Sequence, residues 1–215
     1  DAVSVNINYS NQSKTILDNS FNLNISSNML SAMSDLFISL SGTELKADQV
    51  NLYDFSGYVL EAGISTIVKK TDGSKDEWIE VARELEGKKV LTPPYCTREY
   101  TKTATYDQWF ISLYRSFNNQ YKRGVGVIET AKQCKSVFKS IITYKKKNHE
   151  DAASIYVFDS NGDLIYPYDI SQEYKAALQP YYELTKGDDS ALTFISPLTG
   201  KTEYAAEAVS SYTGY

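Results

Sequence analysis

The stretch TPPYCTREYTKTATYDQWFISLYRSFNNQYKRGVGVIET, residues 92–130, decides how the chain is expected to fold. Apolar and polar residues alternate over 109–117 and again over 125–129, with a polar turn containing Asn and Gly at 118–124 between them. Alternation with a period of two on both sides of such a break predicts a β-hairpin.

The loop before this hairpin is rich in aromatic residues. It places several rings and one guanidinium beside the expected sheet: Tyr95, Arg98, Tyr100, Tyr106 and Trp109. Aromatic walls with a few placed charges are typical of small-molecule pockets. Core and rim packing would explain the same rings, and the sequence leaves both interpretations open.

Composition excludes several classes of protein. The 215 residues are 42% hydrophobic and 23% charged with a net charge of −5, which fits a soluble globular chain and argues against a nucleic-acid surface. No apolar run approaches the roughly 18 residues of a membrane span, and no signal peptide is visible. The chain starts at Asp1 without a Met, so we expect an excised or processed chain whose flanking membrane segments have been removed.

Catalytic and metal-binding motifs are missing from the sequence. It has no GxSxG, no HExxH and no P-loop, and the single His149 lies in a Lys/Asn-rich linker. Two cysteines and one histidine do not form a zinc pattern, although a Cys96–Cys134 disulfide stays open. We therefore expect no enzyme, no cofactor and no metal.

Residues 1–41 are expected to form a long amphipathic helix that Gly42 ends. Its apolar stripe recurs every seven residues at Ile16, Leu23, Leu30 and Phe37. Ser and Asn are weak helix formers, so packing of this stripe must hold the helix. Coiled-coil dimerisation would use the same stripe.

One hairpin pattern occurs twice, about 100 residues apart, as in a duplicated module. VNLYDFSGYVLE (50–61) and IYVFDSNGDLIY (155–166) both read as strand, Asp, two residues, Gly and returning strand. Each copy precedes a helical segment and then a second hairpin: 76–86 and 109–129 in the first, 171–185 and 191–215 in the second. This order suggests two α+β modules with antiparallel sheets and helices on one side.

A connector helix is predicted between the modules at 130–147, with Val137, Phe138, Ile141 and Ile142 as its buried face. It follows Glu129 directly. Movement of the first module's last strand would therefore reach the second module through this helix.

The chain resembles the double Cache (dCache) family, the PAS-like extracytoplasmic sensor domains of bacterial histidine kinases and chemoreceptors. The resemblance covers essentially the whole chain and is carried by YDFSGYVLE, VFDSNGDLIY, PPY at 93–95, ISLYRSF at 111–117, GVGVIE at 124–129 and the closing SSYTGY. The sequences of these motifs are most similar to those of YesM-type sensor histidine kinases of Gram-positive bacteria. It implies an α+β fold with a long N-terminal helix (1–45), a membrane-distal Cache module with the connector (46–149) and a membrane-proximal Cache module (150–215).

The resemblance also implies a function. The chain would be the extracellular, non-enzymatic sensor domain of a histidine kinase anchored in the cell membrane, and it would bind a small polar molecule in the distal module. A chemoreceptor ectodomain and a protein-interaction or adhesion module are the alternatives. Nucleic acid is not an expected partner, and homodimerisation is left open.

In this family the ligand lies over the distal sheet, held by a helix aromatic, the tyrosine of the P-Y loop, sheet residues and an acid closing the last strand. The matching residues, together with those of the aromatic loop, are Trp78, Tyr95, Arg98, Tyr106, Trp109, Ser112, Tyr114 and Glu129. Amino-acid-binding members carry an Arg two residues before the helix aromatic, where this chain has Asp76. Carboxylate recognition would thus depend on Arg98. We expect a small polar ligand with apolar faces, such as a sugar, a nucleobase or an amine.

Overall fold

A computed structural model describes residues 22–23, 47–62, 67–99, 107–118, 124–148, 153–185 and 192–210. The chain divides into two compact units, Asp1–Gln133 and Cys134–Tyr215. The helix expected over residues 1–41 lies outside the described residues except for 22–23, and so do Tyr100 and Tyr106.

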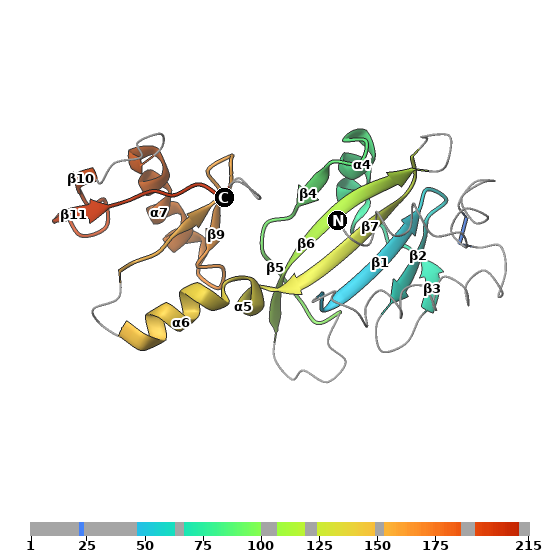
Figure 1. Cartoon of the computed structure of the whole chain (residues 1–215), viewed down its shortest axis with the longest axis horizontal. Helices are drawn as coiled ribbons and strands as arrows, with labels where there is room; N and C mark the ends of the chain where they lie inside the picture. Colours follow the sequence, from blue (N-terminus) through green and yellow to red (C-terminus); the bar gives the residue numbers. More distant parts are fainter. Residues whose placement is uncertain are drawn as a thin grey trace. The chain divides into compact units, whose positions relative to one another are not determined.

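The first unit contains a seven-stranded antiparallel sheet (Figure 1). Its strands are β1 (Gln49–Asp54), β2 (Tyr58–Ala62), β3 (Ile67–Lys70), β4 (Lys89–Leu91), β5 (Tyr95–Thr97), β6 (Gln108–Asn118) and β7 (Gly124–Gln133). The order is β3-β2-β1-β7-β6-β4, and β5 also pairs with β6. The hairpin predicted at 109–129 is therefore confirmed as β6 and β7, and it lies next to β1 in the middle of the sheet.

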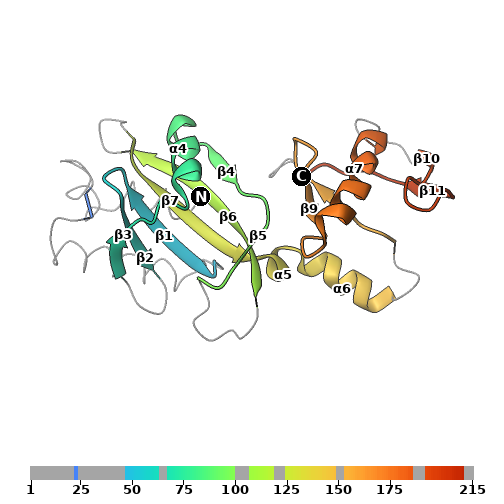
Figure 2. The same ribbon diagram turned by 180° about the vertical axis from the view of Figure 1, so that it is seen from behind.

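Helix α4 (Asp76–Glu84) packs on one face of this sheet, in contact with β4, β6 and β7 (Figure 1 and Figure 2). Successive side chains of a strand point to opposite faces, so residues two apart share a face. On the face toward α4, Tyr53, Tyr114 and Val127 form a buried cluster with Ile79 and Ala82 of the helix. This cluster is the core that fixes α4 over the sheet.

The second unit contains two small antiparallel sheets among its described residues. Its elements are α5 (Cys134–Val137), α6 (Lys139–Asn148), β8 (Val157–Phe158), β9 (Leu164–Tyr166), α7 (Gln172–Thr185), β10 (Leu192–Ile195) and β11 (Thr202–Ala205). Strand β8 pairs with β9 and β10 pairs with β11, which confirms both hairpins expected here. Leu164 of β9 and Leu178 and Tyr181 of α7 form a buried cluster in this unit.

The repeated Asp-x-x-Gly pattern has the same structure in both units. In each copy the Oδ1 of the aspartate, Asp54 or Asp159, accepts hydrogen bonds from the backbone N–H groups two and four residues later, all at 2.9 Å. The glycine that follows has a positive φ, +89° at Gly57 and +88° at Gly162. Asp caps such a turn locally and Gly tolerates the left-handed backbone, which explains why the motif occurs twice.

The connector differs from its prediction. Strand β7 continues to Gln133 because residues 130–133 still pair with β6, so the helical part begins at Cys134 and not at 130. Of the predicted buried face, only Phe138 is buried; Val137 is 43% exposed, and α6 has no buried residue. The connector is thus two short helices that meet at Phe138.

Both cysteines are free. Cys96 is exposed on β5, and Cys134 is buried at the start of α5. The disulfide that the sequence left open is absent.

Candidate functional site

Glu129 is a glutamate with no exposed surface in the middle of strand β7. Its Oε1 accepts a hydrogen bond from Ser112 Oγ at 2.6 Å, and its Oε2 accepts from Tyr53 OH at 2.6 Å and from Asn51 Nδ2 at 2.8 Å. Lys75 Nζ lies 3.2 Å from Oε1. Burying a carboxylate is costly unless it is paired and hydrogen-bonded, and here it is both.

The strand register assembles this group. Asn51 of β1 and Tyr114 of β6 lie opposite Glu129 on either side of β7, so the three residues form a row across neighbouring strands. Tyr53 is two residues from Asn51 on β1, and Ser112 is two residues from Tyr114 on β6, so both side chains lie on the same face of the sheet as the row. The face is the one that α4 covers, since Tyr53 and Tyr114 belong to the cluster under the helix.

The electrostatics keep Glu129 ionised. Burial raises its pKa, but the Lys75 ammonium and the hydrogen bonds from Ser112, Tyr53 and Asn51 outweigh burial and hold the pKa below its ordinary value. Burial, and then the negative charge of Glu129, raise the pKa of Tyr53. The site at neutral pH is therefore a carboxylate facing one ammonium and several neutral donors.

Half-buried aromatic side chains border the polar group. The Tyr95 hydroxyl lies 2.6 Å from Ser112 Oγ, and the Tyr95 ring centroid is 5.7 Å from Lys75 Nζ. The ring of Trp78 on α4 stacks on Tyr114 with 6.4 Å between centroids and an interplanar angle of 19°. Polar groups on the sheet and aromatic faces beside them are the two components that small-molecule sites combine.

The predicted site residues divide into three groups. Tyr95, Ser112, Tyr114 and Glu129 lie together, and Trp78 joins them through its stacking on Tyr114. Arg98 is exposed, and its Nε donates to Asp107 Oδ1 at 2.6 Å. Trp109 is three residues before Ser112 on β6, so its side chain lies on the opposite face of the sheet. Tyr106 lies outside the described residues.

Sequence reasoning missed Asn51, Tyr53 and Lys75. A signal for Asn51 was present, because an amide in the otherwise apolar strand VNLYDF needs a partner once it is buried. Lys75 had no such signal. It lies in the turn before α4, and only the fold brings it to a carboxylate 54 residues away.

Across the residues that the structure describes, no cluster of three or more His, Cys, Asp or Glu side chains could hold a metal ion. Within the same residues no helix is long and apolar enough to cross a membrane.

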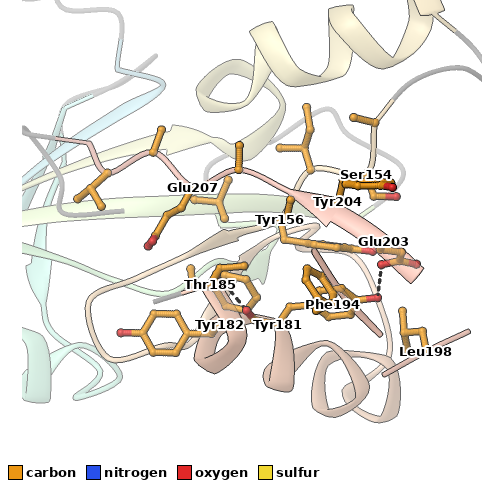
Figure 3. Close-up of a pocket in the computed structure, with 18 of the residues that line it drawn as sticks. Ser154, Tyr156, Tyr181, Tyr182, Thr185, Phe194, Leu198, Glu203, Tyr204 and Glu207 are labelled. Atoms are coloured by element: carbon orange, nitrogen blue, oxygen red, sulfur yellow. Dashed lines mark hydrogen bonds between the residues drawn. The ribbon is translucent and has the colours of Figure 1, made fainter. Parts of the chain in front are cut away.

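A groove of about 1310 Å³ lies in the second unit (Figure 3). Its walls include the rings of Tyr156, Tyr181 and Phe194 and the carboxylate of Glu203. The Tyr181 hydroxyl lies 3.0 Å from Glu203 Oε2, the contact drawn as a dashed line in Figure 3. Another acid of the groove, Asp159, holds the Asp-x-x-Gly turn.

The groove and the Glu129 group are separate features in different units. We place the candidate site at Glu129 because a fully buried carboxylate gathers three neutral donors and an ammonium there. In the groove the acidic groups are only partly buried, and Asp159 serves the local turn. A charged group whose pKa is shifted by burial together with a specific charge partner marks a candidate functional site, and Glu129 is such a group.

Comparison with known proteins shows similarity to solved structures and no match by sequence. The sequence matches no protein-family model and no curated protein sequence. The sensory domain of the Campylobacter jejuni chemoreceptor Tlp3, solved with isoleucine bound, has a similar fold with a TM-score of 0.62, 14% identity and coverage of 95% of this chain and 75% of that one.

Two further solved structures are similar. The ligand-binding domain of the Pseudomonas aeruginosa PAO1 amino acid chemoreceptor PctC, in complex with GABA, has a TM-score of 0.58, 9% identity and coverage of 95% and 79%. The extracellular domain of vpHK1S-Z8, described as a histidine kinase, has a TM-score of 0.55, 13% identity and coverage of 90% and 73%. The chain therefore has the fold of the sensory domains of chemoreceptors and histidine kinases.

Proposed function

We propose that this chain is the extracytoplasmic sensor domain of a membrane-anchored receptor of the double Cache class, and that it binds a small polar molecule over the seven-stranded sheet at Glu129. Its organisation would be a long N-terminal helix (1–45), a membrane-distal module (46–149) and a membrane-proximal module (150–215). The similarity in fold to sensory domains that bind small molecules supports this proposal.

The observation that carries the proposal is the burial of Glu129 among Asn51, Tyr53, Ser112 and Lys75. Replacing a buried ion pair by well-packed apolar residues is often neutral or stabilising, so a sheet of this kind does not need such a group for stability. A buried charge with a specific partner and several oriented donors is a common feature of binding sites.

Between a chemoreceptor and a histidine kinase, the sequence resemblance leads us to propose a histidine kinase. Chemoreceptors and a histidine kinase have similar folds, so the comparisons support both outputs equally. The resemblance of ISLYRSF and VFDSNGDLIY to YesM-type kinases favours a histidine kinase. Expressing the chain on a chemoreceptor and on a kinase signalling module, and measuring which output the ligand changes, distinguishes the two.

A route for the signal follows from chain connectivity. Strand β7 carries Glu129 and continues to Gln133, where α5 of the second unit begins. A ligand can shift the equilibrium between two conformations of the receptor only by the difference in its binding free energy for them. This coupling free energy is typically about 1–3 kcal/mol. A Gly inserted after Gln133, and not after Ala131 inside the strand, should leave ligand affinity intact while weakening the response of the full receptor.

The binding site itself is tested by a metabolite screen with thermal unfolding as the readout. A hit is then titrated by calorimetry against wild type, Glu129→Gln and Tyr156→Ala, the last of which alters the groove. We expect Glu129→Gln to lower affinity at least about tenfold, equal to about 1.4 kcal/mol, and Tyr156→Ala to have no effect. Unchanged affinity in Glu129→Gln with loss in Tyr156→Ala would move the site to the groove and contradict the proposal.

A further inference from the structure

The ammonium group of Lys75 lies inside a cage of two carboxylates and one aromatic ring. Nζ is 3.2 Å from Glu129 Oε1, 3.5 Å from Glu99 Oε2 and 5.7 Å from the centroid of the Tyr95 ring. Only 15% of the Lys75 side chain is exposed. Carboxylates together with a ring face are the groups with which proteins hold an ammonium ligand.

Two carboxylates share the ammonium of Lys75 among the residues that the structure describes. Glu129 Oε1 and Glu99 Oε2 lie 3.2 and 3.5 Å from Nζ, and the charge of Glu99 also acts on Lys69. The adjacent Arg98 pairs with Asp107, and both side chains of that pair are mostly exposed. The two carboxylates therefore favour a cation in the cage and disfavour an anion.

Lys75 is the partner of Glu129 that can be exchanged. The neutral donors Asn51, Tyr53 and Ser112 lie 2.6–2.8 Å from the carboxylate oxygens and are anchored on paired strands. Lys75 makes the longest contacts, 3.2 and 3.5 Å, and reaches the site on a flexible side chain from the turn before α4.

We propose that the Lys75 ammonium is an internal occupant of an ammonium site, and that the cognate ligand carries a primary ammonium that replaces Lys75 on Glu129. This inference rests on the proposed function, because it names the ligand class of the same site. Glu99, the more exposed acid with 38% of its side chain accessible, retains Lys75 after the exchange. One ammonium replaces another, so the exchange neither releases nor takes up a proton.

The exchange also reaches α4. The Lys75 carbonyl accepts the N–H of Ile79 at 3.1 Å, so Lys75 is the N-cap residue of this helix. Releasing its ammonium from Glu129 removes an ionic tie between the start of α4 and the sheet. The same ligand that occupies the cage thereby alters how the helix carrying Trp78 is held.

The inference is tested by chemical rescue. Lys75→Ala leaves a vacant cage, and propylammonium has the same heavy atoms as the part of Lys75 that the substitution removes. Propylammonium chloride should raise the Tm of Lys75→Ala by about 3–6 °C at a tenfold excess over its Kd. Sodium chloride at equal ionic strength should not.

Lys70→Ala is the matched control. It removes the same atoms and charge from a lysine whose Nζ lies 5.9 Å from the centroid of the Tyr58 ring. If Lys75→Ala does not fold, Lys75→Met keeps the apolar stem and should be rescued by ammonium or methylammonium instead. The inference is overturned if amines raise the Tm of the Lys75 variants no more than that of Lys70→Ala.

The ammonium inference can fail while the proposed function stands, and the two failures give different results. A screen hit that is uncharged or anionic, and that still loses affinity in Glu129→Gln, would overturn the ammonium inference and leave the sensor site in place. A hit that is insensitive to Glu129 would contradict the proposed function itself.

Discussion

Lys75 and Glu129 are 54 residues apart in the chain, yet Lys75 Nζ lies 3.2 Å from Glu129 Oε1. The exposed fractions of the two side chains are 15% and 0%. The pair joins the turn before α4 to the centre of the sheet, so its loss affects both a helix and the strands beneath it.

The first prediction concerns stability against acid. The pKa of Glu129 is below its ordinary value of 4.5, since the Lys75 ammonium and three hydrogen bonds outweigh the effect of burial, which raises it. The ionised group therefore stabilises the fold above pH 4.5, and this contribution is lost as the pH falls from there through the folded-state pKa.

Glu129→Gln should accordingly lower stability at neutral pH by about 3–5 kcal/mol, the usual cost of removing one partner of a buried pair. Its difference from wild type should shrink as the pH falls below 4.5. Thermal unfolding across pH measures this difference, with Glu61→Gln in the partly exposed Lys69 pair as the control. A difference that stays constant with pH would contradict the assignment.

Gly126→Ala tests the packing beside the site. A Cβ at Gly126 would lie 2.6 Å from the backbone oxygen of Tyr53 and 2.6 Å from Phe117 Cζ, closer than a Cβ approaches any non-bonded heavy atom. We expect a loss of about 1–3 kcal/mol, measured by denaturant unfolding. Gly124→Ala in the same strand meets only Asn118 Oδ1 at 3.8 Å and should change stability little; equal losses would show that steric crowding is not the cause.

Phe138→Ala tests the corrected connector. Phe138 is 6% exposed, and the centroid of its ring lies 5.0 Å from that of Tyr166 and 5.9 Å from that of Tyr168. Its truncation should destabilise the second unit by about 3–5 kcal/mol. Val137→Ala, at a position 43% exposed, should stay within about 0.5 kcal/mol. Comparable effects of the two changes in thermal unfolding would restore the original prediction of a shared buried face.

Thiol labelling should distinguish the two cysteines. Cys96 is exposed, whereas Cys134 is buried and burial raises the pKa of its thiol to about 12. We expect a thiol reagent to modify one group per native chain and two after denaturation, and Cys96→Ser to abolish the native reaction. Mass spectrometry of the labelled chain identifies the site, and native labelling of Cys134 would contradict its burial.

Arg98→Ala examines the charge of the ligand. Arg98 Nε donates to Asp107 at 2.6 Å and both side chains are more than 60% exposed, so we expect no change in affinity for an uncharged or cationic ligand. Calorimetric titration of wild type and Arg98→Ala with uncharged, cationic and anionic compounds measures this. Binding of anions alone, abolished by the substitution, would show that Arg98 clamps a carboxylate and that the ligand is not an amine.

Local patterns were sufficient to predict several elements. The alternation over 109–129 predicted the β6–β7 hairpin, and the Asp-x-x-Gly stretches predicted the turns at Gly57 and Gly162. These features depend on residues within one turn or one hairpin. Side-chain alternation and the backbone preferences of Asp and Gly therefore specify them without knowledge of the rest of the chain.

The connector could not be predicted in the same way. Residues 130–133 continue β7 because β6 offers partners as far as Gln133 and β1 as far as Ala131, and no local propensity marks where those partners end. Val137 and Phe138 are both apolar, but only tertiary packing decides that Phe138 meets the rings of Tyr166 and Tyr168.

The sequence by itself determined the α+β class, the paired hairpins and part of the group near Glu129, namely Tyr95, Ser112 and Tyr114 with Trp78 beside them. The tertiary structure alone decided that β1 lies beside β7 with Asn51 opposite Glu129, and that Lys75 reaches the same carboxylate. The physical reason is register: a shift of one residue in the pairing of β1 with β7 would turn Asn51 and Tyr53 to the other face of the sheet. Pairing between segments so far apart depends on the packing of the whole unit, which no local pattern contains.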